Sequence, residues 1–229
     1  MSESKLKVLA LDRLRMTTDG SGVTTLICGM GCPLRCRFCI NPGSWDGSVS
    51  GKEYTKEELY EAVKADSLYF LTTGGGLMFG GGEPLLQSGF LKEFMEQYSS
   101  SGWNFYLESS LNVPRKNLED VIPYIEEYLI DTKDMNPDRY HAYTDGDYQR
   151  FLGNLLFLKD RVGQEKIVVR IPTIPFLHKS GEEARLNGEK LKELGFTRLD
   201  FLTYLNPESR KDISETAREN LELLAKRDK

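Results

Sequence analysis

The chain has few of the features that mark secreted, membrane or nucleic-acid-binding proteins. Its four cysteines all lie between positions 28 and 39, so none can link distant segments as the disulfides of a secreted protein do. No apolar run approaches the roughly 20 residues of a membrane span, and the N-terminus lacks the pattern of a signal peptide. The net charge of −5 leaves no basic face for a polynucleotide. We therefore expect a cytoplasmic protein with no membrane and no nucleic-acid partner.

The amino-acid composition is that of an ordinary globular domain. Hydrophobic residues make up 39% of the 229 positions and charged residues 28%. We expect a single domain over residues 1–229 that acts as a monomer. The two histidines, His141 and His178, fall in polar stretches, and we expect both at the surface without a functional role.

Three of the cysteines stand within eight residues, Cys32-Pro33-Leu34-Arg35-Cys36-Arg37-Phe38-Cys39. Closely spaced thiolates of this kind are typical ligands of iron–sulfur clusters. Structural zinc usually takes four ligands, and the remaining cysteine, Cys28, lies in an apolar run predicted to be a strand. Three ligands would leave one iron of a [4Fe–4S] cluster open to bind a substrate. A zinc site or a redox-sensing loop is the alternative.

Six predicted strands alternate with helices along the chain. The strands fall at 22–28, 77–79, 103–107, 128–130, 166–171 and 198–202. Helices are expected after the capping box at 55–58, over 90–98, after Pro114, over 148–158, from Ser180 and from Asp212, while residues 4–15 could form an edge strand or a lead-in. This alternation predicts an α/β fold with a parallel sheet. An incomplete barrel and an open doubly wound sheet are both compatible with it, and both place the chemistry where the strands end.

Glycines and charged residues collect at these predicted strand ends. The run Gly80-Gly81-Gly82-Glu83-Pro84 follows the second strand, where glycines would let the backbone approach a ligand. Asp131-Thr132-Lys133-Asp134 follows the fourth, and a lysine ammonium can pair with a ligand carboxylate. Arg170 lies inside an apolar strand, where an unpaired charge is costly to bury, so it should point into a ligand cavity. A turn that needs positive φ and an exposed Asp–Lys turn are the plainer interpretations of the first two motifs.

These motifs together resemble those of radical S-adenosylmethionine (SAM) enzymes. The segment from Asp19-Gly20-Ser21-Gly22 to Cys39-Ile40-Asn41-Pro42 is similar, more narrowly, to the activating enzymes of glycyl radical enzymes, such as the pyruvate formate-lyase activase. The resemblance covers about residues 15–205. It implies a partial (β/α)6 barrel and a [4Fe–4S] cluster whose catalytic ligands are Cys32, Cys36 and Cys39. The open iron would bind SAM, which reduction would cleave to methionine and a 5′-deoxyadenosyl radical.

The resemblance also implies which residues bind the cofactors. The implied SAM-binding residues are Phe38, Gly81, Gly82, Glu83, Glu108, Ser109, Asp131, Lys133 and Arg170. In this assignment the glycine run binds the SAM amino group, Lys133 pairs with its carboxylate and Arg170 lies near its methionine end. A monovalent cation, Na⁺ or K⁺, would be held by Asp131 with Glu108 and Ser109. Three places depart from the family pattern: Glu108 stands where an aspartate is usual, Leu205 stands where a histidine is usual, and Gly20-Ser21-Gly22-Val23-Thr24 lacks the usual proline and arginine.

The resemblance implies that the chain abstracts hydrogen from a backbone glycine of a separate glycyl radical enzyme, with flavodoxin or ferredoxin as the electron donor. The lack of an inserted domain between the cysteine loop and Gly74 agrees with this reading. Two alternatives stay open. The same radical chemistry could act on a small molecule or a peptide, as in carboxy-deazaguanine synthases. A non-catalytic iron–sulfur electron carrier is also possible, but it would need neither Lys133 nor Arg170.

Overall fold

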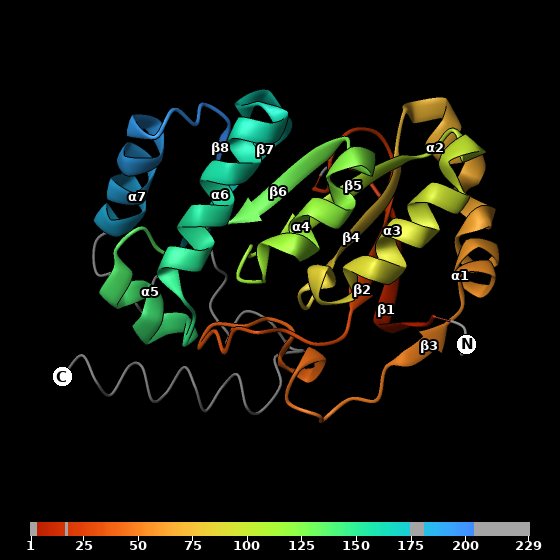
Figure 1. Cartoon of the computed structure of the whole chain (residues 1–229), viewed down its shortest axis with the longest axis horizontal. Helices are drawn as coiled ribbons and strands as arrows, with labels where there is room; N and C mark the ends of the chain where they lie inside the picture. The colour runs from red at the N-terminus through yellow and green to blue at the C-terminus, as the bar shows by residue number, and fades with distance from the viewer. Residues whose placement is uncertain (1–3, 17, 175–180, 204–229) are drawn as a thin grey trace.

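The fold is a curved, mostly parallel sheet covered by helices. The computed structural model describes residues 4–16, 18–174 and 181–203. Its eight strands run in the order β3-β1-β2-β4-β5-β6-β7-β8 (Figure 1). Their bounds are β1 (Leu6–Arg15), β2 (Thr24–Gly29), β3 (Lys52–Tyr54), β4 (Gly76–Gly81), β5 (Asn104–Ser109), β6 (Glu127–Asp131), β7 (Ile167–Thr173) and β8 (Leu199–Thr203).

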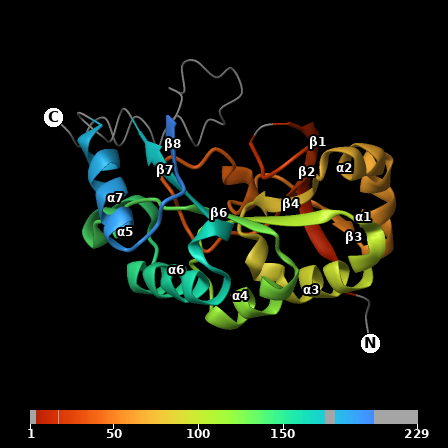
Figure 2. The same cartoon turned by 90° about the horizontal axis from the view of Figure 1, so that it is seen from above.

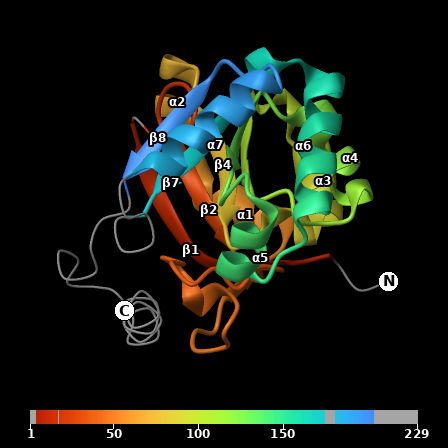
Figure 3. The ribbon, with the colours of Figure 1, turned by 90° about the vertical axis from the view of Figure 1, so that its left-hand side faces the viewer.

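Six of these strands are parallel, which confirms the predicted six-unit arrangement. From β2 through β4 to β8, each strand pairs in parallel with the next. β1 instead pairs antiparallel with β2 and with β3. The sheet curves, as Figure 3 shows, but within the described ranges its two outer strands, β3 and β8, do not pair with each other. The barrel is therefore open on one side.

Seven helices belong to the described residues. They are α1 (Lys56–Val63), α2 (Ser67–Thr73), α3 (Ser88–Gln97), α4 (Arg115–Val121), α5 (Pro137–Thr144), α6 (Tyr148–Val162) and α7 (Glu182–Glu193). Figure 2 shows α3, α4 and α6 side by side along one face of the sheet. The predicted capping box starts α1, because the Thr55 side chain accepts from the Glu58 amide while Glu58 accepts from the Thr55 amide. Within the described ranges, no helix is both long and apolar enough to cross a membrane.

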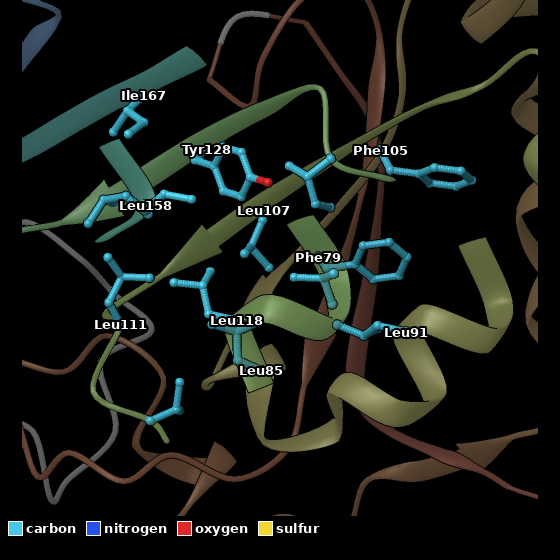
Figure 4. Close-up of a cluster of buried hydrophobic side chains, with 14 of the residues drawn as sticks. Phe79, Leu85, Leu91, Phe105, Leu107, Leu111, Leu118, Tyr128, Leu158 and Ile167 are labelled. Atoms are coloured by element: carbon cyan, nitrogen blue, oxygen red, sulfur yellow. The ribbon is translucent and has the colours of Figure 1, made fainter. Parts of the chain in front are cut away.

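The main core lies between the sheet and these helices. Successive side chains of a strand point to opposite faces, so every second residue packs outward against the helices. Figure 4 shows part of this core, with Phe79, Phe105, Leu107 and Tyr128 from the sheet beside Leu91 of α3 and Leu118 of α4. The inner face has a smaller cluster of Leu26, Cys28, Met78, Tyr106 and Leu129. Two residues beyond Tyr106 and Leu129, towards the strand ends, the same face presents Glu108 and Asp131. Alternation thus directs the polar strand-end residues into the concave side of the sheet.

The sequence predicted all six parallel strands but missed smaller elements. It left residues 4–15 undecided, and they form the antiparallel strand β1. The elements it missed are β3, α2 and α5. α5 has a recognisable start, because the Asn136 side chain accepts from the amides of Asp138 and Arg139 and Pro137 occupies the first turn. The helix expected from Asp212 lies outside the described residues, as do Ser180, His178 and Leu205.

Candidate active site

A cavity of about 730 Å³ lies on the concave side of the sheet, where the parallel strands end. This volume is within the range of small-molecule and cofactor sites. Eleven of the twelve predicted site residues line it, namely Cys32, Cys36, Phe38, Cys39, Gly81, Gly82, Glu108, Ser109, Asp131, Lys133 and Arg170. The exception is Glu83. A smaller cavity of about 260 Å³ between α7 and β8 contains none of the predicted residues.

The cysteine loop rests on the C-terminal end of α5. The backbone amides of Arg35 and Arg37 donate to the carbonyl oxygens of Thr144 and Tyr143, at 2.7 and 2.9 Å. The last carbonyls of a helix have no partner within the helix, so the loop amides donate to carbonyl oxygens that α5 leaves without an intrahelical partner. In Figure 1 the orange loop passes close beside α5. Leu34, Cys36 and Phe38 are buried in a small cluster with Ile174, with Cys32 and Cys39 packed against it.

The three thiols share one wall of the cavity. All four cysteines of the chain are free. Burial, together with the Glu83 carboxylate, raises the pKa of the Cys32 thiol to about 12, while a backbone hydrogen bond from Leu34 and the Lys133 charge oppose the increase; burial also raises the pKa of Cys36 to about 12. Both thiols are thus protonated at neutral pH, and metal binding must release their protons. In the described part of the chain, no three His, Cys, Asp or Glu side chains converge closely enough to hold a single metal ion.

Gly81 and Gly82, at the end of β4, pack against the backbone that leads into the cysteine loop. Gly81 has a φ of +93°, and a Cβ there would come within 2.6 Å of the Cys28 Cα. A Cβ on Gly82 would come within 2.2 Å of the Gly31 carbonyl oxygen. The amides of Gly82 and Glu83 donate to the carbonyls of Gly29 and Gly31, at 3.0 and 2.7 Å. Close packing against the protein's own backbone therefore already requires these two glycines, in addition to any approach to a ligand.

Glu83 lies behind the cavity wall, with none of its surface exposed. Its carboxylate accepts from the Ser109 hydroxyl at 2.8 Å, from the Ser110 amide at 2.9 Å and hydroxyl at 2.6 Å, and from the Leu85 amide at 3.3 Å. Burial raises the pKa of Glu83, while these donors oppose the increase. The side chain thus connects the end of β4 to the end of β5, and in this structure its oxygens face protein groups.

Charged side chains of both signs line the floor of the cavity. Lys133 Nζ lies 2.8 Å from Asp131 Oδ2. Burial, the largest single influence, lowers the Lys133 pKa, but the charge and hydrogen bond of Asp131 together with the nearby Cys36 and Glu108 raise the pKa overall. Arg170 is 8% exposed and faces three carboxylates: Glu108 at 3.5 Å, Asp19 at 3.8 Å and Asp200 at 4.0 Å. Arg170 therefore lies at the cavity surface among carboxylates that compensate its charge. Within the described residues, Arg170 Nε has no hydrogen-bond partner.

Glu108 is a partly buried carboxylate of the cavity whose pKa is strongly raised. Burial and the neighbouring charge of Asp131 raise its pKa to about 7, while Arg170 and Lys133 act in the opposite direction. Gly80 leaves space for it, because a Cβ on Gly80 would lie 3.1 Å from Glu108 Oε2. Glu108 therefore exchanges a proton near neutral pH in the ligand-free protein.

Several cavity residues were not singled out from the sequence. Asp12 and Arg15 come from β1, and Arg15 bonds to both Asp12 and the buried Asp19. Asp200 comes from β8. The alternation of β1 could have indicated Asp12, but nothing local indicates that Asp19 meets Arg170, which is far away in sequence. Cys28 also lines the cavity, from the inner face of β2.

The residues present fit an iron–sulfur cluster and SAM by their chemistry. Three free thiols line one wall, and the two cations Lys133 and Arg170 line the same cavity. The unmatched Arg170 Nε is a donor available to a ligand carboxylate or carbonyl. The carboxylates Glu108 and Asp131 can accept from ribose hydroxyls.

Curated relatives of the chain include two activating enzymes. The pyruvate formate-lyase-activating enzyme of Clostridium pasteurianum is 31% identical over 176 residues, covering 77% of this chain and 72% of the relative. The (2S)-3-sulfopropanediol dehydratase activating enzyme of Klebsiella oxytoca is 29% identical over 217 residues, covering 69% and 68%.

Solved structures share the fold. SuiB of Streptococcus suis, in a crystal structure bound to S-adenosylmethionine, has a TM-score of 0.59 at 12% identity over 86% of this chain, which spans 45% of that larger protein. A domain of the pyruvate-formate lyase-activating enzyme of Bacteroides vulgatus has a TM-score of 0.50 at 22% identity, covering 67% of this chain and 94% of that one. The family described as the radical SAM superfamily matches residues 26–219. The chain therefore belongs to the radical SAM superfamily.

Proposed function

We propose that the chain is an activating enzyme that installs a radical on a backbone glycine of a separate glycyl radical enzyme. The observation that carries this proposal is the similarity to two activating enzymes over more than two thirds of their lengths. The open side of the barrel supports it. The cavity is walled by β1 on one side and by β8 on the other, and the exposed side chains of Asp12 and Asp200 stand at its mouth. A polypeptide loop from a partner can enter there.

The chain's own residues hold the cofactors in this proposal. Cys32, Cys36 and Cys39 bind a [4Fe–4S] cluster, which supplies the electron that cleaves bound SAM to methionine and a 5′-deoxyadenosyl radical. Lys133 pairs with the carboxylate of SAM, and Arg170 lies near its methionine end; both side chains line the cavity. Phe38, Gly81 and Gly82 complete the cavity wall beside the cysteines.

Glu83 has a supporting role in the same proposal. It holds Ser109 and Ser110 at the end of β5, so it acts on the SAM pocket by positioning the neighbouring strand end. This differs from direct contact with SAM, which the sequence resemblance implied.

A monovalent cation completes the proposed site. The carboxylates of Asp131 and Glu108 offer oxygen ligands in the cavity, which Ser109 also lines. Because Glu108 has a pKa of about 7, cation binding to its carboxylate competes with a proton and should weaken as the pH falls below 7. SAM turnover that does not respond to sodium or potassium at any pH would remove the cation from the proposal.

The partners in this proposal are a glycyl radical enzyme as protein substrate and flavodoxin or ferredoxin as electron donor. The test is electron paramagnetic resonance of the reduced enzyme with SAM and a glycyl radical enzyme encoded beside it. A doublet that collapses when the partner glycine is deuterated at Cα supports the proposal. No glycine-centred signal, together with stoichiometric deoxyadenosine formed with a small metabolite or a peptide, would move the chain to the alternative radical SAM function.

A further inference from the structure

Arg35 is an exposed residue whose guanidinium turns back onto the cysteine loop. Its Nη1 donates to the carbonyl oxygens of Cys32 at 2.7 Å and of Leu34 at 2.8 Å. The same guanidinium lies 4.7 Å from the centre of the Trp45 ring. One side chain thus joins two peptide groups of the loop to an aromatic residue beyond the loop's end. We call this contact the Arg35–Trp45 pair.

Trp45 is held at the base of the loop by short-range contacts. It follows the single 3₁₀ turn Pro42–Ser44, and its amide donates to the Pro42 carbonyl at 3.0 Å. The Ser44 carbonyl accepts from the Gly31 amide at 2.7 Å, just before Cys32. The segment that carries Trp45 therefore connects the two ends of the loop and gives Arg35 a fixed surface to stack on.

The backbone of Arg35 is fixed from the other side. Its amide donates to Thr144 at the end of α5, and two residues later the Arg37 amide donates to Tyr143. Arg35 is thus tied to α5 through its backbone and to Trp45 through its side chain. Guanidinium is well suited to this position, because its planar group can stack on an aromatic face while its N–H groups bond to carbonyls at the edge.

From these contacts we propose that Arg35 is a positioning residue for the cluster. By bonding to the Cys32 and Leu34 carbonyls, it fixes the peptide planes on both sides of the Pro33–Leu34 step. The direction in which the Cys32 and Cys36 side chains leave the backbone is then set before iron arrives. This inference rests on the cluster in the proposed function but not on the partner enzyme, so it holds or fails independently of the glycyl radical.

The neighbouring arginine provides a matched control. Arg37 has the same charge and lies in the same loop, but in the part of the chain that the structure describes no hydrogen bond or ion pair is seen for its side chain. Its backbone amide donates to the Tyr143 carbonyl, a bond that alanine keeps. Arg35→Ala and Arg37→Ala therefore remove the same charge, but only the first removes the contacts with Trp45 and the loop carbonyls.

The experiment measures the cluster without partner or turnover. The full chain is reconstituted anaerobically as wild type, Arg35→Ala, Arg35→Lys, Trp45→Ala, Trp45→Phe and Arg37→Ala. Iron per chain is measured, and the rate of cluster loss to a chelator is followed by absorbance. Loss of an outer contact to a metal ligand typically weakens binding about 10- to 100-fold. We expect cluster loss at least about tenfold faster in Arg35→Ala and Trp45→Ala, a rate near wild type in Arg37→Ala and Trp45→Phe, and no rescue by Arg35→Lys.

The stability of the metal-free variants and the comparison between them decide the inference. Melting temperatures of the metal-free variants separate a local effect from general unfolding, and we expect them to match wild type. If Arg35→Ala kept its cluster as firmly as wild type, the contacts of Arg35 would have no effect on the cluster and the positioning role would be wrong. If Arg37→Ala lost its cluster as fast as Arg35→Ala, the loss of a positive charge would explain both results and the positioning role would again be wrong. The positioning role would also be overturned if metal-free Arg35→Ala melted far below wild type and Trp45→Ala kept its cluster. Arg35 would then act on general stability, and its contact with Trp45 would not matter for the cluster.

Discussion

Replacing Glu108 by glutamine should remove a pH dependence of stability from the metal-free, ligand-free protein. In the folded chain, burial and the Asp131 charge raise the Glu108 pKa to about 7, compared with 4.5 for an unperturbed glutamate. The folded state therefore binds a proton that the unfolded state has released between these two values. The stability that this proton provides is fully present below about pH 4.5 and is lost as the pH rises through 7.

The size of this effect follows from the difference between the two pKa values. From 4.5 to about 7, at 1.36 kcal/mol per pH unit, it amounts to about 3 kcal/mol. Because the Glu108 side chain is 26% exposed, solvent screening reduces the expected value to about 2 kcal/mol. Glutamine has nearly the same shape and carries no charge at any pH. The Glu108→Gln variant should therefore match wild type at about pH 5 and exceed its stability by about 2 kcal/mol at about pH 8.

Urea unfolding at several pH values, under reducing and anaerobic conditions, measures this difference. Glu96→Gln, on an exposed position of α3, is the matched control and should keep the wild-type pH dependence. If Glu108→Gln kept that dependence, or were less stable than wild type at about pH 8, the buried and proton-binding state of Glu108 would be refuted.

Three further perturbations test other parts of the site. Glu83→Ala leaves the buried Ser110 amide without its acceptor, so it should lower the free energy of unfolding by about 3 kcal/mol, whereas Ser110→Ala should lower it by about 1 kcal/mol. Equal losses for the two variants in denaturant titrations would contradict this. Cys36→Ala should lose the cluster while Cys28→Ala keeps full iron content, and the reverse would show that the ligands are misassigned. Lys133→Met should weaken SAM binding by at least about tenfold in calorimetry, because the SAM carboxylate loses the buried ammonium group that pairs with it. An unchanged affinity would place Lys133 outside the SAM site.

Local patterns in the sequence predicted most of the fold and the cofactor site. Strands such as β2 and β4 are recognisable because each is a run of consecutive buried residues, whereas β8 is only partly covered; parallel strands bring their carboxyl ends together. Once β5, β6 and β7 are placed, alternation directs Glu108, Asp131 and Arg170 to the same face. The cysteine spacing lies within eight residues, so it needs no tertiary contact to be seen.

The remaining features depend on contacts between distant segments. Nothing near Glu83 shows that its carboxylate turns to Ser109 and Ser110 instead of the cavity. The need for glycine at position 82 comes from the Gly31 carbonyl, 51 residues earlier in the chain. α5 was missed because it is short and half polar, yet it supports the cysteine loop. These features follow from packing, which composition and periodicity do not specify.

The most direct test of the central claim is the Mössbauer spectrum of the reconstituted protein, recorded with and without SAM. Three cysteine ligands leave one of the four irons of a [4Fe–4S] cluster open for SAM. We predict that the signal of one iron in four changes when SAM is added, and that Cys28→Ala shows the same change. Four equivalent irons that do not respond to SAM, or a response that disappears with Cys28→Ala, would contradict a cluster held by Cys32, Cys36 and Cys39.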